Sequence, residues 1–357
     1  MIPNPIAAAI AEQGPVSVER FMEMAVQAYY AQGTAFGRSG DFTTAPEISQ
    51  VFGELIGVWC LLTWRRLGRP DPLYLVELGP GRGTLMADLM RSAALMPDFV
   101  CAARPHLVET SSALRSQQAQ TLAGFAPSWH GSLATVPSDA PLLIVANEFL
   151  DALPIRQFER QESGWHERMV AAATDGSLSF ALSPVPLLET ASLLAPAQEQ
   201  APVGSIAEVN PEALSLIGEI ANRLHEQNGA ALFIDYGPLE SGPGDSLQAI
   251  NSHMYAKVLD SPGEADLTAH VDFAALGRRA ESLGIRAWGP VTQAVWLQRM
   301  GILERAGQLA QSAREDQKEM LVSGIRRLIE PKEMGTLFKV MALTLPGFSV
   351  PSGFEVS

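Results

Sequence analysis

The sequence has few of the residues that characterise several large classes of protein. Only two cysteines occur in 357 residues, Cys60 and Cys101, and their spacing is not that of a metal site. Both lie in apolar surroundings, so we expect reduced core residues. Apolar runs such as PLLIVA end well before the length needed to cross a bilayer. The sequence therefore argues against a disulfide scaffold, a cysteine-rich metal domain and a helical membrane protein.

Positive charge is also scarce. The chain has 25 Lys and Arg against 39 Asp and Glu, for a net charge of −14. An acidic surface repels nucleic acid and anionic membranes, so we expect neither as a partner. Such a surface would instead attract a basic segment of another protein. Neither a Walker-type loop nor a G-x-S-x-G elbow occurs in the sequence, which disfavours NTPases and serine hydrolases.

The most informative stretch is LYLVELGPGRGTL at residues 73–85. Its first six residues have the length and apolar content of a strand buried on both faces. Glycines follow at positions 79, 81 and 83, and helical spacing begins at Thr84. A strand that turns through glycine into a helix presents backbone N–H groups to a ligand. The stretch therefore predicts a nucleotide-like ligand, although an ordinary strand–helix turn is the alternative.

The glycine spacing and Glu77 distinguish between such ligands. The dinucleotide fingerprint G-x-G-x-x-G sets a helix N-terminus against a pyrophosphate. Here the pattern is G-x-G-x-G, and Glu77 stands two residues before the first glycine. A carboxylate at this position would repel a pyrophosphate, whereas it suits a ligand that carries a cationic amino group.

A second acidic residue ends the next predicted strand. The segment PHLVET, residues 105–110, reads as a short strand closed by Glu109. A carboxylate at the end of the second strand can accept hydrogen bonds from both ribose hydroxyls. Glu109 can also cap the following helix, because Ser111 and Ser112 are typical helix-start residues. The two roles are compatible.

Strands and helices alternate from residue 73 onward. Strands are expected at 73–78, 106–109, 128–131, 142–146 and 231–235. Such alternation predicts an α/β fold with a parallel, doubly wound sheet. The segment GTLFKVMALTL, residues 335–345, is expected to add an antiparallel edge strand.

Two further regions accompany this sheet. Helices are expected at 15–35 and 48–68, packed over the first strand as an N-terminal extension or lid covering 1–70. The domain at 71–357 would contain an antiparallel insertion at about 155–205, because turn signals separate alternating segments there. A crossover helix follows at 209–229, with Asn210 as its cap and Pro211 at its first position.

Candidate catalytic residues follow the fourth strand, in ANEFLDALP at 146–154. Ligands of doubly wound sheets bind at the carboxyl ends of the strands, so Asn147, Glu148 and Asp151 should face the cleft. Two carboxylates spaced in this way can hold a guanidinium and help to remove its proton. Both acids could instead cap the next helix. The pair His270 and Asp272 lacks a third ligand, so we expect no metal.

Six segments together resemble one family: GDFTTAPEISQVFGELIG, VELGPGRGTLMADLMR, HLVETSSALRSQQ, NEFLDALPIRQF, FIDYG and PGEADLTAHVDF. On these segments the chain is similar to the MidA-like methyltransferases, which include a mitochondrial arginine methyltransferase that assists the assembly of respiratory complex I. The resemblance implies a class I methyltransferase fold, which is Rossmann-like, and S-adenosylmethionine as cofactor.

The resemblance also implies roles for individual residues. Cofactor contacts would come from Glu77, Gly79, Pro80, Gly81, Gly83, Thr84, Leu85, Glu109 and Asn147. Glu148 and Asp151 would be catalytic. Substrate contacts are expected from two polar segments that precede the glycine turn and end the fifth strand, namely Thr43, Thr44, Glu47, Asp235 and Tyr236.

The leading hypothesis is methyl transfer to an arginine side chain of a protein, such as a subunit of complex I. Two alternatives stay open: an S-adenosylmethionine-binding assembly protein without essential catalysis, and a small-molecule methyltransferase. The N-terminus MIPNPIAAAIAEQG lacks the features of a signal or transit peptide, so we expect a bacterial cytoplasmic protein. The resemblance implies the mitochondrial matrix for eukaryotic relatives. The sequence leaves the oligomeric state open.

Overall fold

The computed structural model describes residues 4–31, 44–94, 96–188, 190–251 and 254–355. The chain divides into two compact units, each assembled from three separate stretches. The first unit comprises Met1–Phe42, Leu150–Leu216 and Glu240–Leu276, and the second comprises Thr43–Phe149, Ile217–Leu239 and Gly277–Ser357. In this division residues 43–70, which the sequence predicts to belong to an N-terminal extension, are part of the second unit.

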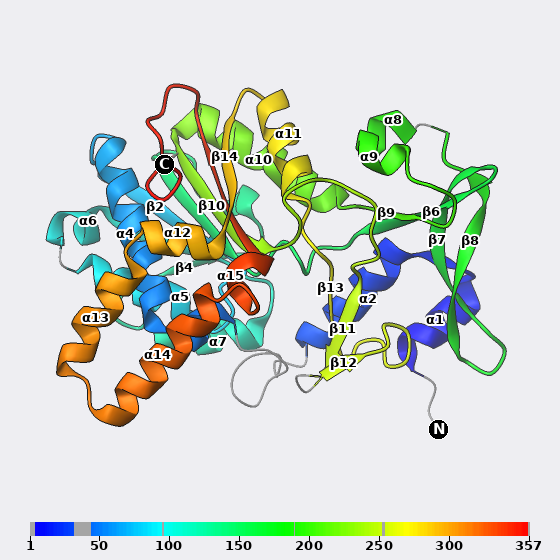
Figure 1. Ribbon diagram of the computed structural model, residues 1–357, viewed down its shortest axis with the longest axis horizontal. Coiled ribbons are helices and arrows are strands. Elements are labelled where there is room, and N and C mark those ends of the chain that lie inside the picture. The colour runs from blue at the N-terminus through cyan, green and yellow to red at the C-terminus, as the bar shows by residue number, and fades with distance from the viewer. Residues whose placement is uncertain (1–3, 32–43, 95, 189, 252–253, 356–357) are drawn as a thin grey trace. The chain divides into compact units, whose positions relative to one another are not determined.

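The second unit is built around a seven-stranded sheet with the order β14-β15-β10-β5-β2-β3-β4 (Figure 1). Its strands, in chain order, are β2 (Leu73–Leu78), β3 (Ala103–Val108), β4 (Ser128–His130), β5 (Leu142–Asn147), β10 (Gly229–Tyr236), β14 (Arg286–Thr292) and β15 (Phe338–Thr344). The pairs that join β4, β3, β2, β5 and β10 are parallel. The predicted α/β doubly wound sheet is therefore confirmed.

The antiparallel strand at the end of the chain is confirmed, but its expected position at the edge of the sheet is wrong. β15 lies between β10 and β14 and is antiparallel to both. Numbered along the chain, the strand order is 3-2-1-4-5-7-6, which is the doubly wound order with one antiparallel strand added. The edge strand β14 was missed because its sequence, RAWGPVT, contains Gly and Pro, and its pairing with β15 is bulged.

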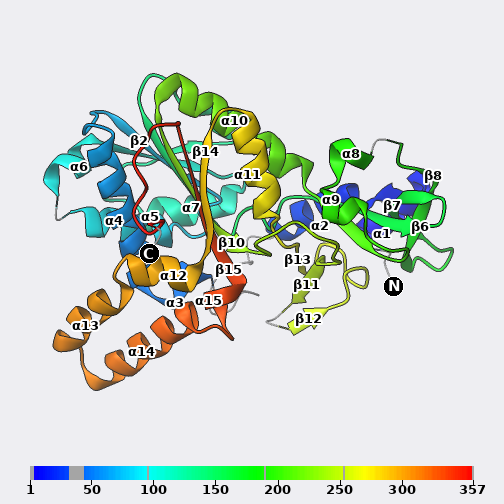
Figure 2. The same ribbon diagram turned by 45° about the horizontal axis from the view of Figure 1, so that its top comes forward.

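Helices cover both faces of this sheet. They are α4 (Gln50–Arg66), α5 (Thr84–Ala93), α6 (Pro97–Ala102), α7 (Ser112–Thr121), α10 (Pro211–Gln227) and α11 (Phe273–Ser282). α4, α5 and α6 lie on one side of the central strands, and α10 and α11 on the other (Figure 2). Every residue of β2, β5, β10 and β15 is buried as a result. Burial on both faces explains the near-continuous apolar sequences of these strands.

Two glycines of α4 allow it to approach α5 closely. A Cβ on Gly53 would lie 2.6 Å from the Cβ of Asp88, and a Cβ on Gly57 would lie 2.8 Å from the carbonyl oxygen of Leu89. Since α5 begins at the glycine turn, this contact fixes the helix that supports the candidate cofactor loop.

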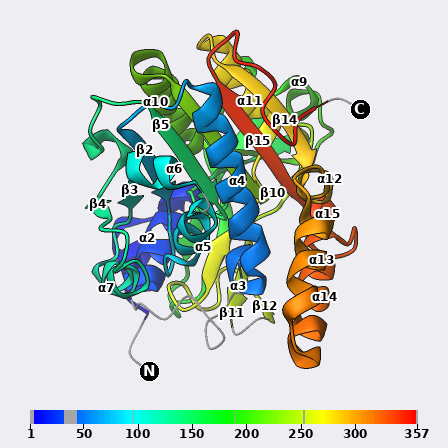
Figure 3. The ribbon, with the colours of Figure 1, turned by 90° about the vertical axis from the view of Figure 1, so that its left-hand side faces the viewer.

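Four C-terminal helices form a group beside α4: α12 (Gln293–Arg299), α13 (Ile302–Ser312), α14 (Glu315–Ile329) and α15 (Met334–Leu337). α13 contacts α4, and α14 contacts the short helix α3 (Ala45–Ile48) (Figure 3). Buried side chains of this group, such as Trp296 and Leu328, belong to the same apolar cluster as the buried face of α4.

The first unit contains a five-stranded antiparallel sheet. Its strands are β1 (Val16–Ser17), β6 (Arg156–Gln161), β7 (Gly164–Ala172), β8 (Leu178–Pro186) and β9 (Ile206–Val209). β7 pairs with β8 along one edge and with β6 and β1 along the other. The predicted antiparallel segment after the fourth strand of the large sheet is therefore confirmed.

The N-terminal helices of the first unit are α1 (Pro5–Gln13) and α2 (Val18–Ala31). The apolar face of α2, including Phe21 and Met22, packs with Val170 and Leu267 in a core of its own. The helix expected at 15–35 is thus present as α2, and its apolar face is buried within the first unit. The second expected helix, α4, packs in one cluster with Leu75 of the first strand of the large sheet, β2.

The remaining elements are short. A small antiparallel sheet of the first unit contains β11 (Gln248–Asn251), β12 (Met254–Ala256) and β13 (Asp266–Thr268). The short helices are α8 (Thr190–Leu193), α9 (Pro196–Glu199) and the 3₁₀ helix η1 (Leu133–Thr135). The predicted cap of α10 is present, since the backbone N–H of Ala213 donates to Oδ1 of Asn210 at 2.8 Å.

Candidate functional site

The glycine turn after β2 has a backbone that only glycine adopts readily at each of three positions. Gly79, Gly81 and Gly83 have φ angles of 63°, 50° and 80°. A Cβ on Gly79 would lie 2.6 Å from Cδ2 of Phe149, so the turn also lacks room for a side chain there. The backbone N–H of Gly79 donates to the carbonyl of Val108 at 3.1 Å, which ties the turn to the end of β3.

The turn leads directly into α5. The backbone N–H of Gly83 donates to the carbonyl of Pro80 at 2.7 Å, and Gly83 is the N-terminal cap residue of α5 without a side chain to satisfy the first N–H groups. The N-terminus of a helix, where backbone N–H groups lack intrahelical partners and the helix dipole is positive, can bind a polar ligand. Thr84 and Leu85 form the first turn, where Leu85 is buried in the core.

Two buried acceptors stand near the carboxyl ends of the neighbouring strands β2 and β5. Glu77 is 3% exposed, and burial raises the pKa of its carboxyl to about 8, against a smaller opposite effect of the Met86 backbone amide. Among the described residues, neither Oε2 of Glu77 nor Oδ1 of Asn147 has a hydrogen-bond partner. Buried acceptors without a donor are costly, so these two atoms fit a ligand that carries N–H donors or positive charge.

Glu109 follows β3 and keeps part of its hydrogen-bonding capacity. Its Oε1 accepts from the backbone N–H of Ser111 at 2.7 Å, and its Oε2 accepts from Nε2 of Gln118 at 3.2 Å. Burial raises the pKa of this carboxyl, and the Ser111 amide and Gln118 partly offset that rise. Each carboxylate oxygen can accept at least one further bond, which suits the two hydroxyls of a ribose.

Glu148 occupies a strained position directly after β5. Its φ of 48° lies in the left-handed region, which is uncommon for residues other than glycine and often marks functional sites. The backbone N–H of Ala45 donates to Oε1 of Glu148 at 2.8 Å, and Nδ2 of Asn147 reaches the same oxygen at 3.3 Å. The backbone N–H of Glu148 donates to the carbonyl of Ile234 at 2.9 Å. The carboxylate is thus fixed at the carboxyl end of the sheet.

The other predicted acids are placed differently. Asp151 is a buried residue of the first unit, where its carbonyl accepts from the backbone N–H of Ala269 at 2.9 Å. Asp235 is only 1% exposed, and its carboxylate accepts from the backbone N–H groups of Phe149 and Tyr236. Tyr236 is buried as well. The Asp235 carboxylate therefore joins the residue Phe149, which follows β5 closely, to the end of β10.

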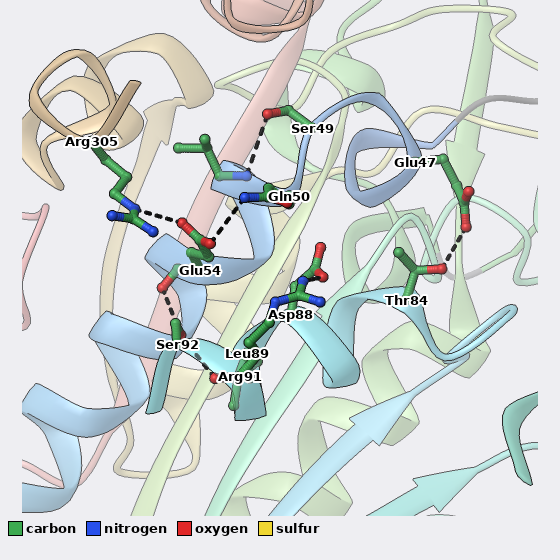
Figure 4. A network of polar contacts seen from close by, with 11 residues as sticks. Glu47, Ser49, Gln50, Glu54, Thr84, Asp88, Leu89, Arg91, Ser92 and Arg305 are labelled. Atoms are coloured by element: carbon green, nitrogen blue, oxygen red, sulfur yellow. Dashed lines mark hydrogen bonds and ion pairs between the residues drawn. The ribbon is translucent and has the colours of Figure 1, made fainter. Parts of the chain in front are cut away.

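The segment around α3 reaches the glycine turn. Oε1 of Glu47 accepts from the Thr84 hydroxyl at 2.6 Å (Figure 4). Its other oxygen lies 3.7 Å from the Arg82 guanidinium. Thr44 is the residue before α3 and makes no side-chain cap bond. Thr43 lies outside the described residues. Glu47 thus contacts the candidate cofactor loop, although it was expected to contact substrate.

A polar network behind the turn connects α4 with its neighbours (Figure 4). Oε2 of Glu54 accepts from Nε of Arg305 on α13 at 2.7 Å, and Oε1 accepts from Gln50 at 3.4 Å. The hydroxyl of Ser92 on α5 donates to the carbonyl of Glu54 at 3.2 Å. Glu54 is 5% exposed, so the Arg305 guanidinium compensates a buried charge.

Sequence reasoning missed three residues of the site. Gln118 contacts both the glycine turn and Glu109, the Ala45 backbone N–H binds Glu148, and Phe149 fills the space that a Gly79 side chain would need. A glutamine in a polar helix and a backbone amide leave no pattern in a sequence. Phe149 could have been suspected, since an aromatic residue directly after a buried strand must find an apolar partner.

The strand order, the left-handed glycine turn and the acidic residues after β2 and β3 together define a doubly wound methyltransferase architecture with a nucleoside site. Within the described ranges, the structure holds no group of three or more His, Cys, Asp or Glu that could bind a metal ion. No helix of those ranges is long and apolar enough to cross a membrane.

Residues 55–291 match the model of a family described as "Putative S-adenosyl-L-methionine-dependent methyltransferase", and the chain belongs to this family, the MidA-like methyltransferases. The expected enzyme class and cofactor, S-adenosylmethionine, are therefore confirmed. The matched segment contains the glycine turn, Glu109 and Glu148.

Named relatives cover almost the whole chain. The zebrafish (Danio rerio) mitochondrial protein arginine methyltransferase NDUFAF7 is 36% identical over 95% of this chain and 85% of its own length. The human protein of the same name is 34% identical over 94% and 81%. A Burkholderia thailandensis protein, solved with S-adenosyl-homocysteine bound, is 27% identical and superposes with a TM-score of 0.83, covering 99% of this chain and 97% of that chain.

Proposed function

We propose that this methyltransferase transfers the methyl group of S-adenosylmethionine to a guanidinium nitrogen of an arginine in a protein substrate. The observation that carries the proposal is Glu148, a carboxylate fixed in a strained backbone conformation at the carboxyl end of the sheet. The names of the relatives, which are protein arginine methyltransferases, support the same acceptor.

Glu148 has the chemistry that an arginine acceptor requires. A carboxylate binds a guanidinium through charge-assisted hydrogen bonds and orients its nitrogen. Two donors, the Ala45 backbone N–H and the Asn147 side chain, hold Oε1, so the carboxylate is positioned before substrate arrives. Glu148 would then accept the proton that the nitrogen loses as its bond to the methyl carbon forms. Asp151 is proposed as a second acid for the guanidinium.

The cofactor-binding residues fit S-adenosylmethionine, which supplies a methyl group activated by a sulfonium. Glu77 and Asn147 would hold the cationic amino end through the buried oxygens that have no partner among the described residues. The glycine turn, with Pro80 and the first residues of α5, would contact the methionine part. Glu109 would accept hydrogen bonds from the ribose hydroxyls. Thr44, Glu47, Asp235 and Tyr236 are proposed to shape the acceptor side.

Replacing Glu148 by Gln tests the acceptor chemistry. The amide keeps the size of the side chain but removes the charge and the proton acceptor, so we expect methyl transfer to fall by about 10²- to 10⁴-fold. Binding of S-adenosyl-homocysteine should stay within about threefold of wild type, because Glu148 is assigned to the acceptor arginine and not to the cofactor. Transfer is measured with methyl-tritiated S-adenosylmethionine and extract of cells that lack the protein, followed by acid hydrolysis and separation of methylarginines.

The matched control is Glu281→Gln, an exposed glutamate on α11 in the same unit. This variant should behave as wild type in both assays. The proposal is supported if the wild-type protein places label in methylarginine and the Glu148→Gln variant does not. Label in another amino acid or a small molecule would refute the arginine acceptor. Unchanged transfer by Glu148→Gln would remove this residue from the mechanism.

We also propose a partner and a location. The names of the relatives connect them with mitochondria, and the resemblance described above connects the family with respiratory complex I. A subunit of complex I with an exposed arginine is therefore the proposed substrate, in a bacterial cytoplasm. The acidic chain, with its net charge of −14, is suited to a basic segment around that arginine.

A further inference from the structure

Gln118 on α7 connects the glycine turn to the proposed ribose acid. Its side chain is 0% exposed. Nε2 donates to the carbonyl of Gly81 at 2.7 Å and to Oε2 of Glu109 at 3.2 Å, while Oε1 accepts from Nε1 of Trp129 at 2.9 Å. One side chain thus joins three elements of the sheet end: the loop after β2, the residue after β3, and β4.

These three partners allow only one orientation of the Gln118 amide. Gly81 and Glu109 present oxygen atoms that only accept, whereas the Trp129 indole N–H only donates. A flipped amide would set oxygen against two acceptors and the NH₂ group against a donor. Trp129 therefore determines which end of the amide faces Glu109, and both hydrogens of Nε2 are used.

The same helix also packs directly on the turn. A Cβ on Gly83 would lie 3.5 Å from Cα and from Cγ of Gln118, so the backbones of α7 and the turn are in close approach. Ser111, the cap residue of α7, holds the other oxygen of Glu109 through its backbone N–H. Glu109 is therefore held from both sides by the start and the middle of one helix.

We propose that Gln118 is a positioning residue for ribose recognition, which orients the Glu109 carboxylate and holds it in register with the glycine turn. With one oxygen bound to the Ser111 amide and the other to Gln118, the remaining lone pairs are directed toward the two ribose hydroxyls. The inference rests on the proposed assignment of Glu109 to the ribose. It adds a residue, Gln118, that affects ribose binding through Glu109 without contacting the ligand.

The test compares two ligands on the full-length protein by isothermal titration calorimetry. The ligands are S-adenosyl-homocysteine and its 2′-deoxyribose analogue, and the variants are Gln118→Met, Trp129→Phe and Glu109→Ala. Gln118→Met should weaken the binding of S-adenosyl-homocysteine by about 10- to 100-fold, the effect of losing hydrogen bonds to a charged group. Binding of the analogue should weaken far less. The ratio of the two dissociation constants, that of the analogue over that of S-adenosyl-homocysteine, should therefore fall toward 1. Trp129→Phe, which removes the bond from the indole N–H to Gln118, should also lower this ratio, by about threefold or more.

The matched control is Gln293→Met. Gln293 is also 0% exposed, lies in the same unit, and donates from Nε2 to the carbonyl of Leu328 at 2.9 Å. Its loss should lower the unfolding midpoint, as measured by thermal denaturation, without changing the ratio.

The ratio also separates the ways in which the proposal can fail. An unchanged ratio in Gln118→Met, with both ligands weakened equally, would make Gln118 merely structural and overturn the proposal. Should Gln118→Met fail to fold, an unchanged ratio in Trp129→Phe would overturn it equally. A wild-type ratio in Glu109→Ala would overturn the ribose assignment together with the proposal. None of these outcomes depends on methyl transfer, so they leave the arginine acceptor untouched.

Discussion

Replacing Glu77 by Gln should stabilise the protein without ligand while weakening the binding of cofactor. The carboxyl of Glu77 is buried, and burial raises its pKa from the ordinary 4.5 to about 8. Glutamine has the same shape, can keep an oxygen near the Met86 amide, and carries no charge to bury. Keeping this buried carboxyl protonated at neutral pH is thus a cost that the folded protein bears for its ligand.

The size of this cost follows from the pKa. Between pH 4.5 and pH 8 the folded state binds more protons than the unfolded state at this group, so stability falls as the pH rises through this window. Each pH unit contributes about 1.4 kcal/mol, which amounts to about 3 kcal/mol at pH 7. Glu77→Gln avoids this loss, and its unfolding midpoint at pH 7 should rise by about 5–10 °C. The advantage should nearly vanish near pH 4.5.

The assay is thermal unfolding of ligand-free wild type, Glu77→Gln and the surface control Glu281→Gln from pH 5 to pH 8. Calorimetric titration with S-adenosyl-homocysteine at pH 7 should show at least a tenfold loss of affinity in Glu77→Gln, because the charge that pairs with the amino group is gone. A Glu77→Gln protein that is no more stable than wild type at pH 8 would refute the reasoning. A stability difference that is equal at pH 5 and pH 8 would do the same.

Two further predictions concern the scaffold around the site. Gly57→Ala places a methyl group 2.2 Å from the Ser92 hydroxyl and 2.8 Å from the Leu89 carbonyl, so α5 must move. We expect the free energy of unfolding, measured with denaturant, to fall by about 1–3 kcal/mol, and S-adenosyl-homocysteine to bind more weakly in calorimetry. Unchanged values would contradict the close helix contact. Burial lowers the pKa of His106 to about 4, with smaller contributions from His130 and an arginine, so between pH 6.5 and pH 4 the unfolded state binds more protons and stability falls as the pH is lowered. His106→Phe should therefore lose about 2 kcal/mol less than wild type between pH 7 and pH 5 in denaturant titrations. Equal losses would argue against a neutral buried His106.

Much of the large sheet could be predicted from the sequence because buried parallel strands leave continuous apolar runs. The bounds of β2, Leu73–Leu78, match the expected strand residue for residue, and the glycines mark its end. β14 gave no such run, since Gly289 and Pro290 interrupt it. Without β14 the antiparallel strand β15 had no neighbour beyond it and was taken for an edge. The position of β15 in the strand order depends on its pairing with β14, which is seen only in the folded chain.

The candidate site was predictable to the extent that its residues follow strands directly. Glu77, Glu109 and Glu148 could be placed because they stand at or next to strand ends, which meet at one edge of a parallel sheet. The direction of a side chain is a different matter. Asp235 also stands at a strand end, yet its carboxylate accepts from the backbone N–H groups of Phe149, which follows β5, and of Tyr236 in β10. Gln118 lies in mid-helix, and only three-dimensional packing brings it to Glu109.

The position of β15 has a consequence for the order in which the protein folds during synthesis. β15 lies between β10 and β14, so neither of its two pairings can form before residues 338–344 have left the ribosome. All stretches of the first unit end by Leu276, whereas the second unit continues to the end of the chain. The unit that carries the glycine turn is therefore completed last, although that turn is synthesised within the first quarter of the chain.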